Sequence, residues 1–325
     1  MKNILYRNSV FIILLSTTFI LITSYGQTKE VIIPKIPTEL KAYYENLCIA
    51  ELELKNNNFS KALELGINAE KHWKPTYELV ELKIHCYIGM HRIEKAKEFM
   101  VYEMEKFNVH DYYFISPYYG IKKDNEITKY LHDKEMEIQN KIPKEKMDLK
   151  AQWDQIDYCF SLLSNSYFLF PELLDSNTII KLKNKYKNHD NSFIEDDCII
   201  KPIEDIIKKV GFPDRTNICS NTTKRDLIFI RFPIKNKDIL LDSALVQGKI
   251  HPYYYAYIYD RCFITNFYGT KMTKNETSGR ICFDFIPDVK NVDKRRKSIG
   301  LPPLFLSYSE SEFSTEYKQL QPNKK

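Results

Sequence analysis

The sequence contains none of the short motifs that mark common catalytic and nucleotide-binding sites. It has no Gly-x-Gly-x-x-Gly, no phosphate-binding Gly-Lys-Ser/Thr loop, no Gly-x-Ser-x-Gly elbow and no His-Glu-x-x-His. These motifs hold backbone amides, nucleophiles or metal ligands at fixed spacings, so their absence argues against the corresponding chemistries. No cofactor is therefore predicted.

Metal-binding patterns are also missing. The seven histidines are scattered, and no two of them share a predicted helix at the spacing of metal ligands. No cysteine pair has Cys-x-x-Cys spacing, which argues against a zinc knuckle or a thioredoxin-type site. The acidic stretch 189–197 lacks the spacing of a calcium loop, so a solvated loop is favoured there. The sequence predicts no metal site.

Strong net charge is absent as well. The formal charge is only +5, of which Lys2 and Arg7 near the N-terminus contribute two. This value is too small to indicate a nucleic-acid partner. The only local basic cluster is 294–297, for which a solvent-exposed turn is favoured over a patch that binds phosphate or an anionic polymer.

Long apolar runs are limited to the N-terminus. The run 10–22 has thirteen residues, fewer than the roughly 20 that span a bilayer as a helix, so a retained anchor is the less favoured alternative. Small residues at positions 24 and 26 fit a signal peptidase site, and no lipid-anchoring cysteine follows. We predict a signal peptide over 1–26, cleaved before Gln27. The mature protein is expected to be exported to the periplasm, the cell surface or the medium, without stable membrane insertion.

Cysteine occurs in an odd number, seven, in a chain for which export permits disulfide bonds. At least one thiol must therefore stay free or pair with another molecule. Cys48 and Cys86 lie in apolar helical patterns, where a reduced, core-filling side chain is favoured. Cys262 and Cys282 lie in runs that we interpret as neighbouring strands, and they are the best candidates for a bridge.

An internal repeat organises the predicted first domain, residues 27–142. The pattern apolar-x-Lys-Ala occurs at 59–62 and again at 93–96, 34 positions later. This period resembles tetratricopeptide repeats, in which two antiparallel helices need a small residue where they cross. Ala62 and Ala96 take that position, and the resemblance covers about residues 40–108. The sequence therefore predicts antiparallel helix pairs with turns near 56–58 and 89–91.

Two repeats need a further unit to cover their apolar faces. The segment 111–142 is predicted to supply it, with aromatic residues first and a helix over 126–139. Packing of these aromatic residues against the repeats is favoured over the alternative that they line a groove for a peptide, as in many tetratricopeptide arrays. A protein or peptide partner is thus one candidate ligand.

The predicted second domain, residues 143–305, is mainly helical with a small β element, and a polar tail follows at 306–325. Helical spacing or capping residues predict helices at 144–164, 175–187, 202–210 and 239–247. Short β-rich runs at 262–264, 267–268 and 281–285 predict a hairpin or three-stranded sheet. The fold class is therefore mainly α, with tetratricopeptide-type helix pairs followed by a helical domain with a small β-hairpin or three-stranded sheet.

The second domain contains an ordered set of short motifs: Asp175-x-Asn177, Ile207-x-x-Val210-Gly211-Phe212-Pro213, Tyr255-Ala256-Tyr257-x-Tyr259-Asp260-Arg261, Tyr268-Gly269-Thr270, Val292-Asp293-x-Arg295-Arg296 and Gly300-Leu301-Pro302-Pro303. This ordered set resembles a bacterial family known only as a domain of unknown function. The resemblance covers about residues 150–305 and brings no activity with it. The chain has Arg231-Phe232-Pro233 where the family pattern has Gln-His-Ala, and Lys271 where the pattern has Gln.

The stretch 251–261 concentrates the candidate functional residues, and it has two interpretations. In the favoured one, Asp260 and Arg261 form a buried charged joint, and Gly269 and Thr270 close a turn beside it. In the other, Asp260 is a general acid or base, Arg261 binds an anionic group and His251 assists. The candidate binding residues are Tyr253, Tyr255, Tyr257, Tyr268, Thr270, Arg295 and Arg296.

These interpretations lead to two functional hypotheses. The first is an exported protein-binding or peptide-binding module, or a scaffold, that uses the repeat groove and the tyrosine-rich region. The alternative is a hydrolase that acts on a cell-envelope polymer or peptide through Asp260, Arg261 and His251. A catalytic Asp260 should lie in an open pocket, whereas a structural one should be buried with all its partners internal. Oligomeric state cannot be read from the sequence.

Overall fold

The computed structural model describes residues 33–107, 126–163, 195–218, 225–263, 266–274 and 281–307. Contacts divide the chain into residues 1–34 and residues 35–325, and every element below belongs to the second unit. Several predicted features lie outside the described residues: the signal peptide, the aromatic residues 112–119, the helix at 175–187 and most of the tail. Across the part of the chain that the structure describes, no helix combines the length and the apolar composition needed to cross a membrane.

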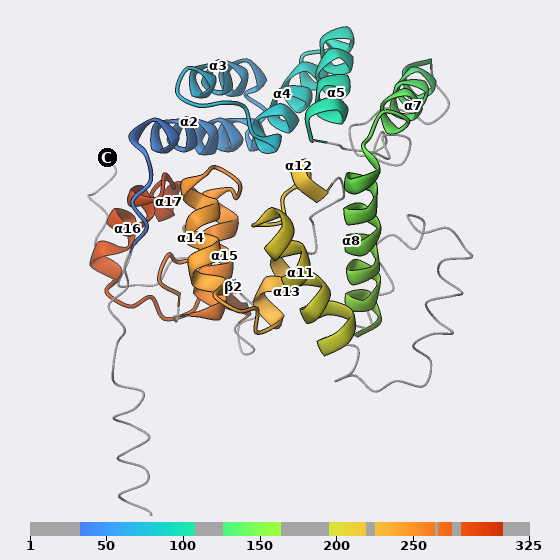
Figure 1. The fold of residues 1–325 in the computed structure, drawn as a ribbon. Coiled ribbons are helices and arrows are strands. Elements are labelled where there is room, and N and C mark those ends of the chain that lie inside the picture. The colour runs from blue at the N-terminus through green and yellow to red at the C-terminus, as the bar shows by residue number, and fades with distance from the viewer. Residues whose placement is uncertain are drawn as a thin grey trace, which may run out of the picture. The chain divides into compact units, whose positions relative to one another are not determined.

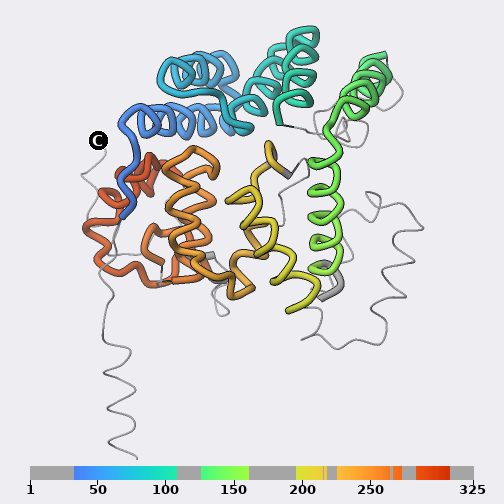
Figure 2. Tube along the Cα trace, viewed as in Figure 1, coloured from blue at the N-terminus to red at the C-terminus, as the bar shows by residue number. Residues whose placement is uncertain are grey.

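The predicted mainly helical class is confirmed, and its first four helices form consecutive hairpins (Figure 2). The second and fourth of them begin 34 residues apart, as the repeat predicts. Ala62 and Ala96 are buried, and Asn57 and His91 take positive φ angles in the intervening turns. The four helices are α2 (Thr38–Lys55), α3 (Phe59–Glu70), α4 (Tyr77–Gly89) and α5 (Ile93–Phe107).

A further helix, α7 (Glu126–Gln139), has the predicted bounds and contributes to the same apolar core. Its Leu131 packs in a cluster with side chains of α4 and α5. Because these side chains leave water together, α7 covers a face that the helix pairs alone would expose. The buried members of the cluster are Val80, Ile84, Met100, Met104, Phe107 and Leu131.

The following helices also match their sequence patterns. The apolar face of α8 (Lys144–Leu163) buries Trp153, Ile156 and Cys159 at helical spacing. The short apolar run near 227–230 is helical, and Pro233 follows its end. The remaining elements of this part are η2 (Asp196–Ile200), α11 (Lys201–Val210), α12 (Arg215–Ile218), α13 (Arg225–Arg231) and α14 (Lys237–Val246), labelled in Figure 1 where there is room.

The tyrosine-rich stretch forms a helix, α15 (Pro252–Cys262), and residue 263 is a turn, which corrects the strand predicted at 262–264 at its two described residues. His251 caps its first turn, Pro252 occupies the first helical position, and tyrosine rings stack four residues apart. These local interactions outweigh the β propensity of tyrosine. Cys262 therefore ends a helix, and its thiol is free, so the predicted bridge to Cys282 is wrong. Cys48 and Cys86 are free and buried, as expected.

The predicted C-terminal sheet is not supported at the expected extent. Residues 266–268 form a bend and a turn, so the strand predicted at 267–268 is absent. Two three-residue strands, β1 (Met272–Lys274) and β2 (Ile281–Phe283), pair antiparallel with Thr273 opposite Cys282. The β content of the described residues is therefore too small to form a layer of its own.

The segment after β2 is helical and partly buried. It contains η3 (Val289–Asn291), α16 (Val292–Ser298) and α17 (Leu304–Ser307). Ile286, Val289, Val292 and Leu304 form its apolar cluster. The predicted exposed basic turn at 294–297 is wrong, because these residues are helical and two of their four basic side chains, Arg295 and Arg296, are buried.

Candidate functional site

Asp260 lies near the end of α15 with only 2% of its surface exposed. One carboxylate oxygen accepts a hydrogen bond from the Tyr268 amide at 2.8 Å. The other accepts from the Thr270 amide at 2.8 Å and from the Thr270 hydroxyl at 2.7 Å. Burial raises the pKa of this carboxyl, and the three hydrogen bonds act in the opposite direction. The carboxylate thus holds the turn 268–270 and has no open side toward a substrate.

Gly269 makes this turn feasible in two ways. Its φ of +72° lies in the left-handed region that other residues rarely adopt. A Cβ atom at this position would lie 2.9 Å from a methyl group of Leu304. The Tyr268-Gly269-Thr270 motif therefore reflects the needs of a tight, buried turn.

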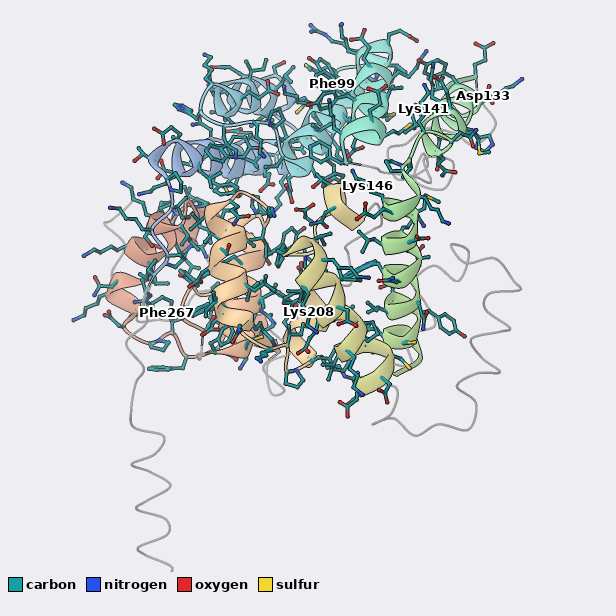
Figure 3. All side chains as sticks on the ribbon, in the orientation of Figure 1. Phe99, Asp133, Lys141, Lys146, Lys208 and Phe267 are labelled. Atoms are coloured by element: carbon teal, nitrogen blue, oxygen red, sulfur yellow. The ribbon has the colours of Figure 1, made fainter. Side chains whose placement is uncertain are left out.

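The two buried arginines of α16 bind backbone carbonyls of neighbouring segments. Arg295 donates to Phe267 O at 2.8 Å and to Pro287 O at 2.7 Å, and its guanidinium lies 4.5 Å from the Phe267 ring centre. Phe267 is labelled in Figure 3. Arg296 donates to Tyr268 O, Pro302 O and the Ser307 hydroxyl at 2.8 to 2.9 Å. The arginines are therefore fixed cross-links, and only Arg296 also reaches a pocket.

The predicted ion pair between Asp260 and Arg261 does not form. Successive residues of a helix project about 100° apart, so these two side chains face different surroundings. Arg261 folds back over the Tyr257 ring at 3.5 Å and donates to the Tyr257 carbonyl at 3.2 Å. The remaining candidate, Tyr255, is buried and donates to Asp242 Oδ1 at 2.8 Å. These residues stabilise α15 and its packing.

A pocket of about 460 Å³ lies elsewhere, away from Asp260. Helices α2 and α4 supply two of its walls, and the start of α15 together with residues 296–307 supplies the rest. Its volume falls within the range of about 300–1,000 Å³ typical of ligand sites. The lining residues are Cys48, Glu51, Leu52, Leu54, Lys55, Glu78, Glu81, Leu82, His85, His251, Tyr253, Tyr254, Arg296, Leu301, Pro302 and Ser307.

Three side chains in this pocket converge, and we name them the Cys–Glu–His cluster: Cys48, Glu51 and His251. The Cys48 Sγ lies 3.7 Å from His251 Nε2, and Glu51 Oε1 lies 3.7 Å from the same nitrogen. All three ligand-type atoms lie within 4.8 Å of one another. His251 Nδ1 accepts from the Tyr253 amide at 3.2 Å, which fixes the ring as the cap of α15. The cluster therefore combines a rigid imidazole with two side chains from one face of α2.

Burial in the pocket disfavours ionisation of two of its groups, Glu51 and Cys48. Burial raises the pKa of the Glu51 carboxyl although 35% of the side chain is exposed, because it faces the pocket and is surrounded by protein atoms. Burial also raises the pKa of the Cys48 thiol well above its usual value. It lowers the pKa of the His85 imidazole. A cation bound in the pocket would lower the free-energy cost of ionising Glu51 and Cys48.

Sequence reasoning found part of this pocket and missed the rest. His251, Tyr253 and Arg296 were candidates and do line it, whereas Asp260 and Arg261 do not. The missed residues lie on α2 and α4. Cys48 and Glu51 are three residues apart, and Glu78, Glu81 and His85 recur at spacings of three and four residues. This spacing places each set on one helical face, a signal that the apolar pattern of both helices obscured.

Comparison of the chain with protein-family models, curated proteins and solved structures found no match. The two resemblances drawn from the sequence therefore stay predictions.

Proposed function

We propose that this protein is an exported binding module of the periplasm or cell surface whose pocket holds a positively charged side chain of a protein or peptide partner. The observation that carries the proposal is the composition of the pocket. Glu51, Glu78 and Glu81 supply carboxylates, and Tyr253 and Tyr254 supply aromatic rings. Lysine and arginine side chains bind to carboxylates and to aromatic faces.

The charge of Glu78 supports this choice of ligand, although Lys55 and Arg296 also line the pocket. Glu78 contributes to the raised pKa of Tyr44, Tyr254 and Glu51, after burial as the main cause. Its charge thus acts on Glu51 and Tyr254 in the pocket and on Tyr44. In the proposed fold, α2–α3 and α4–α5 are tetratricopeptide-type pairs, and α2 and α4 are the helices that line the groove. The buried geometry of Asp260 gives no support to the hydrolase alternative.

Fluorescence polarisation with two labelled peptides of equal length tests the proposal, one rich in lysine and one rich in glutamate. The lysine peptide should bind and the glutamate peptide should not. The net charge of +5 makes this informative, because unspecific attraction would favour the acidic peptide. Replacement of two pocket carboxylates, Glu78→Gln with Glu81→Gln, should weaken binding by about tenfold, the effect of two partly screened charges.

The matched control is Glu98→Gln, which removes a carboxylate that pairs with Lys95 at 2.6 Å on the exposed surface of α5. This variant should bind the lysine peptide as the parent protein does. Equal binding of both peptides, or an unchanged affinity in the double variant, would exclude the pocket as the site for a cationic ligand.

A further inference from the structure

We propose that the Cys–Glu–His cluster binds a Zn²⁺ ion through Cys48 Sγ, Glu51 Oε1 and His251 Nε2, with a fourth coordination position open to the pocket. Thiolate, imidazole and carboxylate are the ligands that zinc prefers in proteins. Three protein ligands with one free position are typical of zinc sites that bind an exogenous molecule. This proposal does not depend on the proposed binding of a peptide.

The distances fit a shared ion, and the 3.7 Å contact between Cys48 Sγ and His251 Nε2 also fits a hydrogen bond to sulfur. Zinc bonds of about 2.0–2.3 Å at tetrahedral angles place neighbouring ligand atoms about 3.3–3.7 Å apart. Two sides of the cluster measure 3.7 Å, and the third is at most 4.8 Å. The Glu51–His251 distance exceeds the range of an N–H to oxygen hydrogen bond. One N–H at Nε2 also cannot serve Cys48 and Glu51 at once.

The charges and the exposure of the cluster are suited to a divalent ion. A thiolate and a carboxylate together neutralise Zn²⁺, so the ion and its three ligands carry no net charge. Cys48 and His251 are 4% exposed, whereas Glu51 faces the pocket. The ion would therefore have two fixed ligands at the floor and an entry path past Glu51.

Metal binding carries one structural cost. The lone pair of His251 Nδ1 accepts the Tyr253 amide proton. A metal at Nε2 shifts the ring proton to Nδ1, so this capping hydrogen bond is lost. Such a bond is worth roughly a tenfold change in an equilibrium constant, which is small compared with the affinity of a three-ligand zinc site. The amide of Tyr253 should consequently report on occupancy.

Titration of the metal-free, untagged full chain with Co²⁺ tests the site, because cobalt replaces zinc and gives visible absorption. One equivalent of Co²⁺ should produce a thiolate charge-transfer band and the absorption of a tetrahedral ion, and one equivalent of Zn²⁺ should abolish both. Cys48→Ser should remove the thiolate band, and His251→Asn should weaken binding by about 100-fold or more. Asparagine is itself a good helix cap, so this variant removes the ligand and keeps the cap.

Cys262→Ser is the control, because it removes a free thiol that lies outside the pocket. It should leave the Co²⁺ spectrum unchanged. Absence of a thiolate band in the parent protein, or its persistence in Cys48→Ser, overturns the proposal. If Cys48→Ser fails to fold, the effect of Zn²⁺ on the melting temperature decides: parent protein and Cys262→Ser should be stabilised, and His251→Asn should not. Fluorescence polarisation of the lysine peptide in the presence of a chelator tests peptide binding without metal. It therefore separates failure of the zinc proposal from failure of the proposed peptide binding.

Discussion

Asp260 shows how a residue that has the chemistry of a catalyst can instead be fixed by its surroundings. Its two oxygens accept three hydrogen bonds from Tyr268 and Thr270, all from within the protein. Hydrogen bonds to a buried carboxylate are strong because the donors have no competing water. A general acid or base needs an open side toward its substrate, and this carboxylate has none.

Asp260→Asn should therefore destabilise the protein. The NH2 group of asparagine cannot accept a hydrogen bond, and it would replace one of the two oxygens that now accept from Tyr268 or Thr270. At least one buried donor therefore loses its partner, at a cost of about 1–3 kcal/mol. For a chain of this size, we expect the melting temperature to fall by several degrees. Asp205→Asn is the control, because its exposed i, i+3 pair with Lys208 contributes little. An unchanged melting temperature of Asp260→Asn would remove the structural role assigned here.

Residue types alone favoured a structural role for Asp260, Gly269 and Thr270. Glycine permits a tight turn, and a neighbouring hydroxyl and a carboxylate can hold that turn by hydrogen bonds. They did not predict that Arg261 would leave the joint, since side-chain direction depends on the helix that forms there. Nor did they predict the Cys–Glu–His cluster. Cys48 and His251 are 203 residues apart, and no local pattern encodes contact across such a distance.

At the scale of elements, α16 acts as a cross-link rather than as a basic surface. Arg296 binds Tyr268 O, Pro302 O and the Ser307 hydroxyl with separate guanidinium nitrogens. One side chain thus connects the turn beside α15 to both ends of the segment 302–307. Binding these three acceptors at once requires a planar group with several fixed donors, and lysine has no such group.

Arg296→Lys should consequently loosen the segment 302–307 even though the charge is kept. We expect a loss of about 2–4 kcal/mol in the free energy of unfolding, because at least two buried acceptors lose a charged donor. Urea denaturation measures the loss, and hydrogen exchange should show faster exchange of the 304–307 amides. Lys297→Met, on the exposed side of the same helix, should change neither. Equal stability of Arg296→Lys would mean that the apolar cluster alone holds the segment.

Elements with strong helical spacing were predictable from the sequence, and those built on tyrosine were not. Helix α7 has the predicted bounds, and α8 and α11 deviate by one residue. No element was predicted for 252–261, and a strand was predicted from Cys262, the last residue of α15. Within this helix the ring centres lie 6.2 Å apart for Tyr253 and Tyr257 and 5.7 Å apart for Tyr255 and Tyr259. Such local ring contacts and the His251 cap have no simple signature in the sequence.

At the scale of the whole molecule, the two predicted domains meet through buried polar and close contacts. The Tyr44 hydroxyl on α2 donates to the Ile250 carbonyl at 3.0 Å. Gly300 approaches α2 so closely that a Cβ atom would lie 2.7 Å from the Cβ of Tyr44. The pocket lies at this junction, so its shape depends on both parts of the chain. The boundary at residue 143 stays a prediction, but the two parts are not independent near the pocket.

Buried tyrosines at this junction and around α15 predict alkaline instability of the whole molecule. Burial raises the pKa of Tyr259 to about 12 and that of Tyr44, Tyr255 and Tyr268 further. An unfolded tyrosine ionises near pH 10, so above that pH the unfolded chain loses protons that the folded chain keeps. Stability is therefore fully present below about pH 10 and falls as pH rises, by up to about 1.4 kcal/mol per pH unit for each such tyrosine.

Urea denaturation at several pH values between 8 and 12, with tyrosinate absorbance recorded in parallel, measures this fall. The absorbance of the buried tyrosines should rise only together with the loss of helical circular dichroism. Tyr44→Phe removes one of these hydroxyls and should make the decline with pH shallower, although the lost bond to Ile250 O lowers stability at pH 8. Ionisation of all tyrosines near pH 10 with helicity retained would contradict the burial assigned to them. A fall in stability that starts only above pH 10 would instead tie the alkaline limit of the fold to the buried tyrosines of α2, of α15 and of the turn at 268–270.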